Sequence, residues 1–185
     1  MPLDKKNHQT LLQIAKQSIQ HGLDTNKLIS TVLNDYVPEL HKKTATFVTL
    51  EINNNLRGCI GTLLAIRPLA EDVAYNAHAA AFSDPRFPQL KQDEVAALDI
   101  HISLLSEPEL MSFDSEEDLI QQLRPYVDGL ILTDGVHKGT FLPSVWESLT
   151  QPSEFLRYLK QKAGLPPDYW SNKLTVERYT TEYIS

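Results

Sequence analysis

The single cysteine of the chain is the residue whose surroundings most suggest chemistry. Cys59 stands in the segment Arg57-Gly58-Cys59-Ile60-Gly61, between two glycines and two positions after an arginine. Glycine weakens a strand and often marks a place where a ligand or another backbone approaches closely. A thiol beside a cation forms the nucleophilic thiolate more readily. We therefore predict a catalytic pair, with Cys59 as the nucleophile or thiol carrier and Arg57 as its activating neighbour.

The same two residues also have a purely structural interpretation. Free cysteines are among the residue types most often buried, where they pack as small apolar side chains. Arg57 would then form a surface ion pair that contributes little to stability. The sequence leaves both interpretations open.

Alternation along a strand over residues 56–65 predicts which way the thiol points, because successive side chains face opposite sides. The more apolar set, which should face the core, is Leu56, Ile60, Thr62 and Leu64. Cys59 and Arg57 then lie together on the less buried face. On a strand over residues 98–105, the same alternation places His101 on the polar face. If that strand neighbours the Cys59 strand, His101 becomes the base for the thiol.

Two further segments carry polar side chains with two interpretations each. Asp84 and Arg86, in Asp84-Pro85-Arg86-Phe87-Pro88, either bind a ligand or pair with each other, and the two prolines favour the structural role. His78, among the alanines of residues 77–81, either points into a cleft or lies on a solvated helix face.

Composition excludes several classes of protein. The chain has 185 residues, 42% of them hydrophobic and 22% charged, which is typical of a globular protein. Its net charge of −7 argues against a nucleic-acid binder, and no apolar run is long enough to cross a membrane. One cysteine excludes an intrachain disulfide and fits the reducing cytoplasm. The six histidines show no metal-ligand spacing, so we predict no metal site.

The periodicity of the chain predicts an α+β protein of two similar halves. Helices are expected at 5–21, 25–33, 69–82, 116–123 and 154–163, and strands at 44–52, 56–65, 98–105, 130–133, 136–141 and 174–184. Each half then contains a β-hairpin, a helix and a strand. The turns at 55–59 and 135–139 correspond loosely, which suggests an ancient duplication. We place the subdomains at 1–105 and 116–185, with a seam at 106–115.

Six motifs in one order give the chain a resemblance to a known family. They are Leu56-Arg57-Gly58-Cys59-Ile60-Gly61, Ala80-Ala81-Phe82-Ser83-Asp84-Pro85-Arg86-Phe87, Ile102-Ser103-Leu104-Leu105 with Pro108-Glu109, Asp128-Gly129-Leu130-Ile131-Leu132, Gly139-Thr140-Phe141-Leu142-Pro143-Ser144-Val145-Trp146-Glu147, and Phe155-Leu156 with Lys162-Ala163-Gly164-Leu165. With these motifs the chain resembles the AMMECR family, whose microbial branch is called AmmeMemoRadiSam system protein A. The resemblance covers nearly the whole chain, from about residue 10 to the end.

The resemblance implies a fold, partners and site positions. The fold is a single AMMECR-type domain of two α+β subdomains with a cleft between them. The partners are a Memo-family protein and a radical S-adenosylmethionine protein. The motif positions expected to bind a ligand, beside the catalytic Cys59 and Arg57, are Gly58, Ile60, Gly61, Asp84, Arg86 and Glu109. His78 and His101 are not family motif residues, which weakens a mechanism that uses either as the base.

Two classes of function remain open at this point. The protein is an enzyme or enzyme component that uses Cys59 in a group-transfer or modification reaction, or it is a non-catalytic scaffold that binds a peptide or ligand. The residues name no cofactor, no substrate and no oligomeric state.

Overall fold

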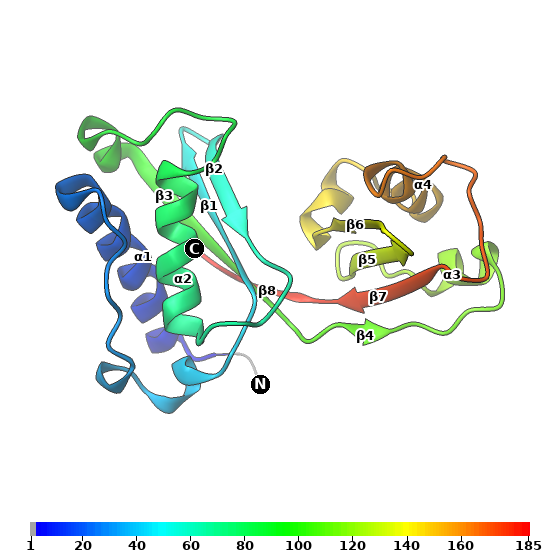
Figure 1. Ribbon diagram of the computed structural model, residues 1–185, viewed down its shortest axis with the longest axis horizontal. Helices are drawn as coiled ribbons and strands as arrows, with labels where there is room; N and C mark the ends of the chain where they lie inside the picture. The colour runs from blue at the N-terminus through cyan, green and yellow to red at the C-terminus, as the bar shows by residue number, and fades with distance from the viewer. Residues whose placement is uncertain (1–2) are drawn as a thin grey trace. The chain divides into compact units, whose positions relative to one another are not determined.

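The structure is a computed structural model that describes residues 3–185 and divides into two compact units (Figure 1). The first unit comprises Met1–Leu105 with Glu182–Ser185, and the second comprises Ser106–Thr181. Each unit holds its own four-stranded sheet, its own helices and its own hydrophobic core. The predicted α+β class is confirmed.

The first unit places two α-helices on one face of its sheet. Its elements are α1 (Lys5–Thr25), the 3₁₀ helices Leu33–Asp35, Pro38–His41 and Gln92–Ala97, β1 (Thr46–Ile52), β2 (Asn55–Gly61), α2 (Leu69–Phe82), β3 (Leu98–Leu105) and β8 (Thr181–Ile184). The strand order is β2-β1-β3-β8, with β1 antiparallel to both β2 and β3. β2 is therefore an edge strand.

Helix α2 approaches the sheet closely because its inner stripe consists of small side chains. The stripe of Ala70, Val73, Ala74, Ala77 and Ala81 is buried. A buried network fastens the helix to β1: the Asp72 carboxylate accepts bonds from the Thr46 amide and hydroxyl over 3.1 and 2.7 Å. This packing fixes the strand that lies beside Cys59.

The second unit shares the hairpin, helix and strand of the first, but its fourth strand, β4, precedes these elements, whereas β8 follows them in the first unit. Its elements are β4 (Glu109–Leu110), α3 (Glu116–Gln122), β5 (Gly129–Asp134), β6 (His137–Phe141), a 3₁₀ helix (Pro143–Glu147), α4 (Pro152–Lys162) and β7 (Thr175–Tyr179). The sheet order is β4-β7-β5-β6. In both units the first strand of the hairpin pairs with the strand that follows the α-helix. Register aligns Gly58, opposite Leu50, with Gly139, opposite Leu132.

The start of the chain differs from the prediction. The helix expected at 25–33 is absent, and α1 instead runs through Gly22 to Thr25. Gly22 lies inside the helix, where the Phe82 ring takes the place of a side chain: an added Cβ would lie 2.3 Å from Phe82 Cε2. Asn26 ends the helix in the left-handed conformation, with φ of 56°.

The expected strands at 56–65 and 174–184 are also shorter in the structure. β2 ends at Gly61, and the following turn is closed by the Leu64 amide donating to the Thr62 hydroxyl over 3.1 Å. The final strand is two strands, β7 and β8, which belong to different sheets. They separate at Thr180, whose amide donates to the Ser106 hydroxyl over 3.0 Å.

Candidate functional site

Cys59 lies on the face of the first sheet that is opposite to the helices. Leu50 pairs with Gly58 and is fully buried, whereas the next pair, Thr49 with Cys59, faces the other side. Ile60 packs against the core, as the alternation predicted. Leu56 does not, because the register shifts beside Gly58 and leaves Arg57 as an extra residue on β2. This bulge breaks the regular alternation on which the shared face of Arg57 and Cys59 was predicted.

The sulfur, the amide and the carbonyl of the half-buried Cys59 each have a partner. Its sulfur lies 3.2 Å from the Thr49 hydroxyl oxygen. Its amide donates to Asp84 Oδ2 over 2.9 Å, and its carbonyl accepts a bond from Arg86 Nη2 over 3.2 Å. Asp84 and Arg86 thus take the place of the neighbouring strand that an edge strand lacks.

Asp84 and Arg86 form one rigid ionic unit. The Asp84 side chain is only 2% exposed and accepts bonds from Arg86 Nε and Nη2 over 2.9 and 2.7 Å. These bonds hold the pKa of the Asp84 carboxyl well below its usual range, and they raise the pKa of Arg86. Half of the Arg86 side chain, 54%, remains exposed, and no described residue accepts a bond from its Nη1.

The Arg57 guanidinium is bound to a different partner. Its Nε and Nη2 donate to the Glu94 carboxylate over 2.7 and 3.0 Å, and its Nη1 donates to the Pro88 carbonyl over 3.0 Å. The hydrogen bond from Arg57 lowers the pKa of Glu94. Every bond described for this guanidinium holds the segment after α2 against β2, and none involves the Cys59 sulfur. Activation of the thiol by Arg57 therefore stays a prediction.

His101 shares the face of Cys59 but not a neighbouring strand. Thr49 pairs with Cys59 on one side and with His101 on the other. Two strand spacings separate the thiol from the imidazole, about 10 Å, so the condition set for a direct base is not met. The His101 ring stacks on Tyr183 and its Nε2 lies 3.5 Å from Glu51 Oε2.

Sequence reasoning missed Thr49 and Glu51 as members of this row. The available signal was the alternation within β1 itself, where these polar residues interrupt the apolar series Val48, Leu50 and Ile52. Cys59, Thr49 and His101 form a row across three strands on this face, with Glu51 beside it.

Comparison with known proteins places the chain in a family. The AMMECR1 family model matches residues 12–184.

The chain belongs to the AMMECR1 family.

Relatives from archaea match it along most of their length. A protein of Methanothermobacter thermautotrophicus is 36% identical over 98% of this chain and 95% of its own length. A protein of Thermococcus onnurineus is 38% identical over 93% of this chain and 86% of its own. The crystal structure of the uncharacterized protein PH0010 from Pyrococcus horikoshii superimposes with a TM-score of 0.89 at 36% identity, covering 98% of this chain and 92% of that one.

The two glycines of the AMMECR1 motif are explained by contacts within the chain. A Cβ on Gly58 would lie 2.2 Å from the Ala80 carbonyl oxygen, in the backbone of α2. A Cβ on Gly61 would lie 2.3 Å from the Phe47 ring. The close approach that these glycines permit is made by the protein's own helix and its own aromatic ring.

The remaining predicted positions lie elsewhere in the chain. Glu109 belongs to the second unit, where it is exposed and faces Arg178 Nε at 4.0 Å. His78 contacts Phe82 in α2, and burial lowers its pKa, with a smaller effect from His21. Within residues 3–185, no three His, Cys, Asp or Glu side chains gather as they would around a metal ion. No described helix is long and apolar enough to span a membrane.

Proposed function

We propose that this AMMECR1-family protein is an enzyme or enzyme component in which the Cys59 thiol carries out a group-transfer or modification reaction. One observation carries the proposal: the sulfur lies on the sheet face opposite to the helices, 3.2 Å from the Thr49 hydroxyl, with its main chain held by Asp84 and Arg86. These contacts fix the backbone that carries the thiol. A nucleophile on a rigid strand, held by a second layer of contacts, is the arrangement that catalysis requires.

In the proposed reaction the sulfur forms a bond to the transferred group. The bond between that group and its first carrier breaks, and its electron pair leaves with the carrier. The thiol proton passes to the leaving group or to water. Attack by a second acceptor then releases the group and restores the thiol.

The neighbours of Cys59 have distinct roles in this reaction. The Thr49 hydroxyl donates to the sulfur as negative charge develops on it. Arg86 provides the nearby positive charge, and Asp84 fixes both Arg86 and the Cys59 amide. Arg57 acts indirectly. Together with Glu94 it holds the segment after α2, which carries Asp84 and Arg86, against β2.

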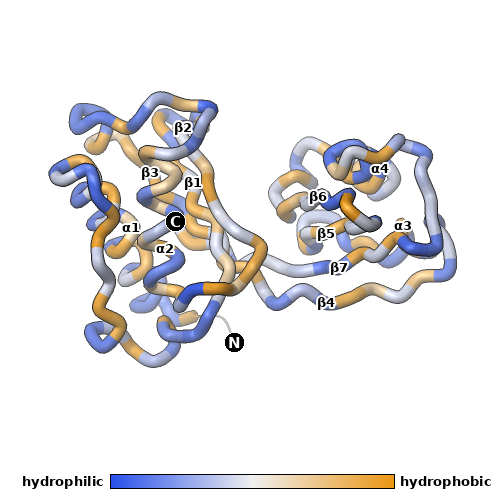
Figure 2. The backbone as a smooth tube through the Cα atoms, in the orientation of Figure 1, coloured by the Kyte–Doolittle hydropathy of each residue, from blue (hydrophilic) through white to orange (hydrophobic). Residues whose placement is uncertain are grey.

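We place the protein in the AmmeMemoRadiSam branch of the family, acting in the cytoplasm. A Memo-family protein and a radical S-adenosylmethionine protein would supply the other steps. Figure 2 shows hydrophobic stretches in the loop between β2 and α2. Leu64 and Ile66 of this loop are 62% and 54% exposed, so the loop offers an apolar contact surface for such a partner.

Thiol alkylation together with complementation tests the catalytic role. We expect Cys59 to react with iodoacetamide about tenfold faster than a cysteine in an unfolded peptide. We expect Cys59→Ser to fold normally and to fail in complementing a deletion strain. A thiol that reacts only as free cysteine, together with full complementation by Cys59→Ser, would refute the proposal.

The exposed loop favours a second candidate function, a non-catalytic scaffold. In that case Leu64→Ser with Ile66→Ser should abolish binding to a purified Memo-family protein from the same genome, while Cys59→Ser should bind normally and complement. Loss of complementation by Cys59→Ser with partner binding intact would reject the scaffold in favour of the enzyme.

A further inference from the structure

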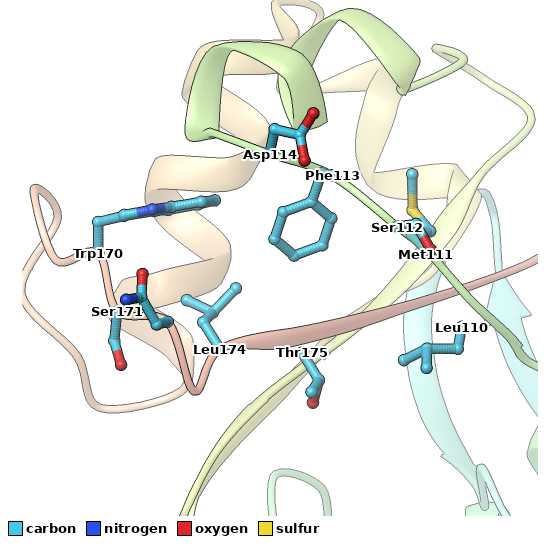
Figure 3. A pocket seen from close by; sticks show the side chains of 10 residues that line it. Leu110, Met111, Ser112, Phe113, Asp114, Trp170, Ser171, Leu174 and Thr175 are labelled. Atoms are coloured by element: carbon cyan, nitrogen blue, oxygen red, sulfur yellow. The ribbon is translucent and has the colours of Figure 1, made fainter.

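The second unit contains a hollow of about 380 Å³ beside its edge strand β4 (Figure 3). Two segments line it, residues 110–114 and residues 170–175 without Lys173. Its size falls within the range of sites for small molecules. No residue of this hollow belongs to the row around Cys59, so what binds here is independent of the proposed reaction.

Two aromatic rings form the apolar part of the hollow. Phe113 and Trp170 are both half-buried, with ring centroids 5.6 Å apart and planes at 57° to each other. The buried side chains of Met111 and Leu174 complete the apolar lining. The two rings pack against each other and both line the hollow. A cation over the face of an aromatic ring is attracted by the negative charge of its π system, and a neutral group of the same shape is not.

The charge of the lining is negative. Asp114 is the only charged residue that lines the hollow; it is exposed, and no described residue donates to its carboxylate. Lys160 Nζ lies 5.8 Å from the centroid of the Trp170 ring. Lys160 is fully buried, however, and does not line the hollow; it pairs with Glu116 over 2.5 Å. The charge that lines the hollow is therefore the carboxylate of Asp114.

We propose that this hollow binds the ammonium group of an organic cation, against the packed rings of Phe113 and Trp170 and beside the carboxylate of Asp114. The other polar lining groups are the hydroxyls of Ser112, Ser171 and Thr175 and the amide of Asn172. They hydrogen-bond the rest of the ligand. A neutral sugar would also use rings and hydroxyls, but it would gain nothing from the charge of Asp114.

Tryptophan fluorescence provides a direct measurement. The chain has two tryptophans, of which Trp146 is fully buried against Phe155 and Trp170 lines the hollow. Choline and its neutral isostere 3,3-dimethylbutan-1-ol would be titrated into the full chain, with methyl glucoside as the sugar. We expect a saturable change in fluorescence with choline. The affinity for the isostere should be weaker by about fivefold or more. Trp170→Phe should abolish the fluorescence change, because Trp146 is buried outside the hollow and should not respond to the ligand.

Two variants separate charge recognition from unspecific adsorption. Asp114→Asn should weaken choline binding about fivefold, the effect of one partly exposed charge. Asp168→Asn, at an exposed acid outside the hollow, should leave it unchanged. Equal affinity for choline and its isostere, preference for the glucoside, no saturable change, or an unaffected Asp114→Asn variant would each overturn the proposal. Far-UV circular dichroism of each variant checks that it is folded.

Discussion

The amide of Cys59 donates to the carboxylate of Asp84, which lies 25 positions away in the chain and is almost completely buried. This bond is one of several that join the thiol strand to the segment after α2. The Arg86 guanidinium pairs with the same carboxylate and also donates to the Cys59 carbonyl. The position of the thiol therefore depends on a carboxylate that lies outside its strand.

Replacing Asp84 should destabilise the first unit. In Asp84→Asn an amide oxygen still accepts the Cys59 N–H, but Arg86 loses its charge partner and faces an N–H₂ group. We expect the free energy of unfolding in urea to fall by about 2–4 kcal/mol. The exposed Asp93→Asn should change it by less than about 0.5 kcal/mol. Equal effects of the two variants would show that the buried pair contributes nothing.

The same carboxylate predicts how stability depends on pH. Arg86 lowers the pKa of Asp84 in the folded state. Its contribution is therefore fully present above the unfolded value, about 3.9, and is lost as pH falls through the lowered folded value. The difference in unfolding free energy between the wild type and Asp84→Asn should stay constant from neutral pH to about pH 5 and shrink below about pH 4. A difference that grows on acidification would contradict this sign.

Thr49 rather than His101 should govern the reactivity of the thiol. Thr49→Val keeps the shape of the side chain but removes the hydroxyl 3.2 Å from the sulfur. We expect the rate of iodoacetamide alkylation at neutral pH to fall about fivefold, corresponding to one hydrogen bond. His101→Gln should change the rate by less than about twofold, because β1 separates it from Cys59. A larger effect of His101→Gln would restore the histidine as the base.

Gly58 should be intolerant of any side chain. Gly58→Ala places a methyl group 2.2 Å from a backbone oxygen of α2, and a helix backbone cannot yield as a side chain can. We expect a loss of about 3 kcal/mol or more in thermal or urea unfolding. Gly135→Ala is the matched control, since its Cβ meets nothing within 4 Å and its positive φ costs only about 1 kcal/mol. Comparable losses would mean that α2 can move away from β2.

The sequence predicted elements with strong periodicity and failed where a distant contact decides. Helix α2 and strand β3 have the predicted limits, because an alanine stripe and a strict apolar alternation mark them. The pattern predicts that the first helix ends at residue 21, whereas α1 continues through Gly22, beside the ring of the distant Phe82, to Thr25. The β-bulge at Arg57 depends on the register with β1, which no local pattern reveals. The pairing of Thr49 with both Cys59 and His101 likewise depends on the order and register of the strands.

The two arginines near the motif should separate into different roles. Iodoacetate is anionic and iodoacetamide is neutral, so the ratio of their alkylation rates reports the positive potential at the sulfur. Arg86→Gln should lower this ratio about threefold or more, because half of its side chain faces solvent beside the Cys59 carbonyl.

Arg57→Gln should leave the ratio of alkylation rates within about 1.5-fold of the wild type. It should instead speed hydrogen exchange at the amides of Phe87 and Leu90, because the bonds to Glu94 and Pro88 that hold this segment are lost. If Arg57→Gln lowers the ratio and leaves exchange unchanged, the cation that acts on the thiol is the one predicted from the sequence motif. Arg86 would then serve only to pair with Asp84.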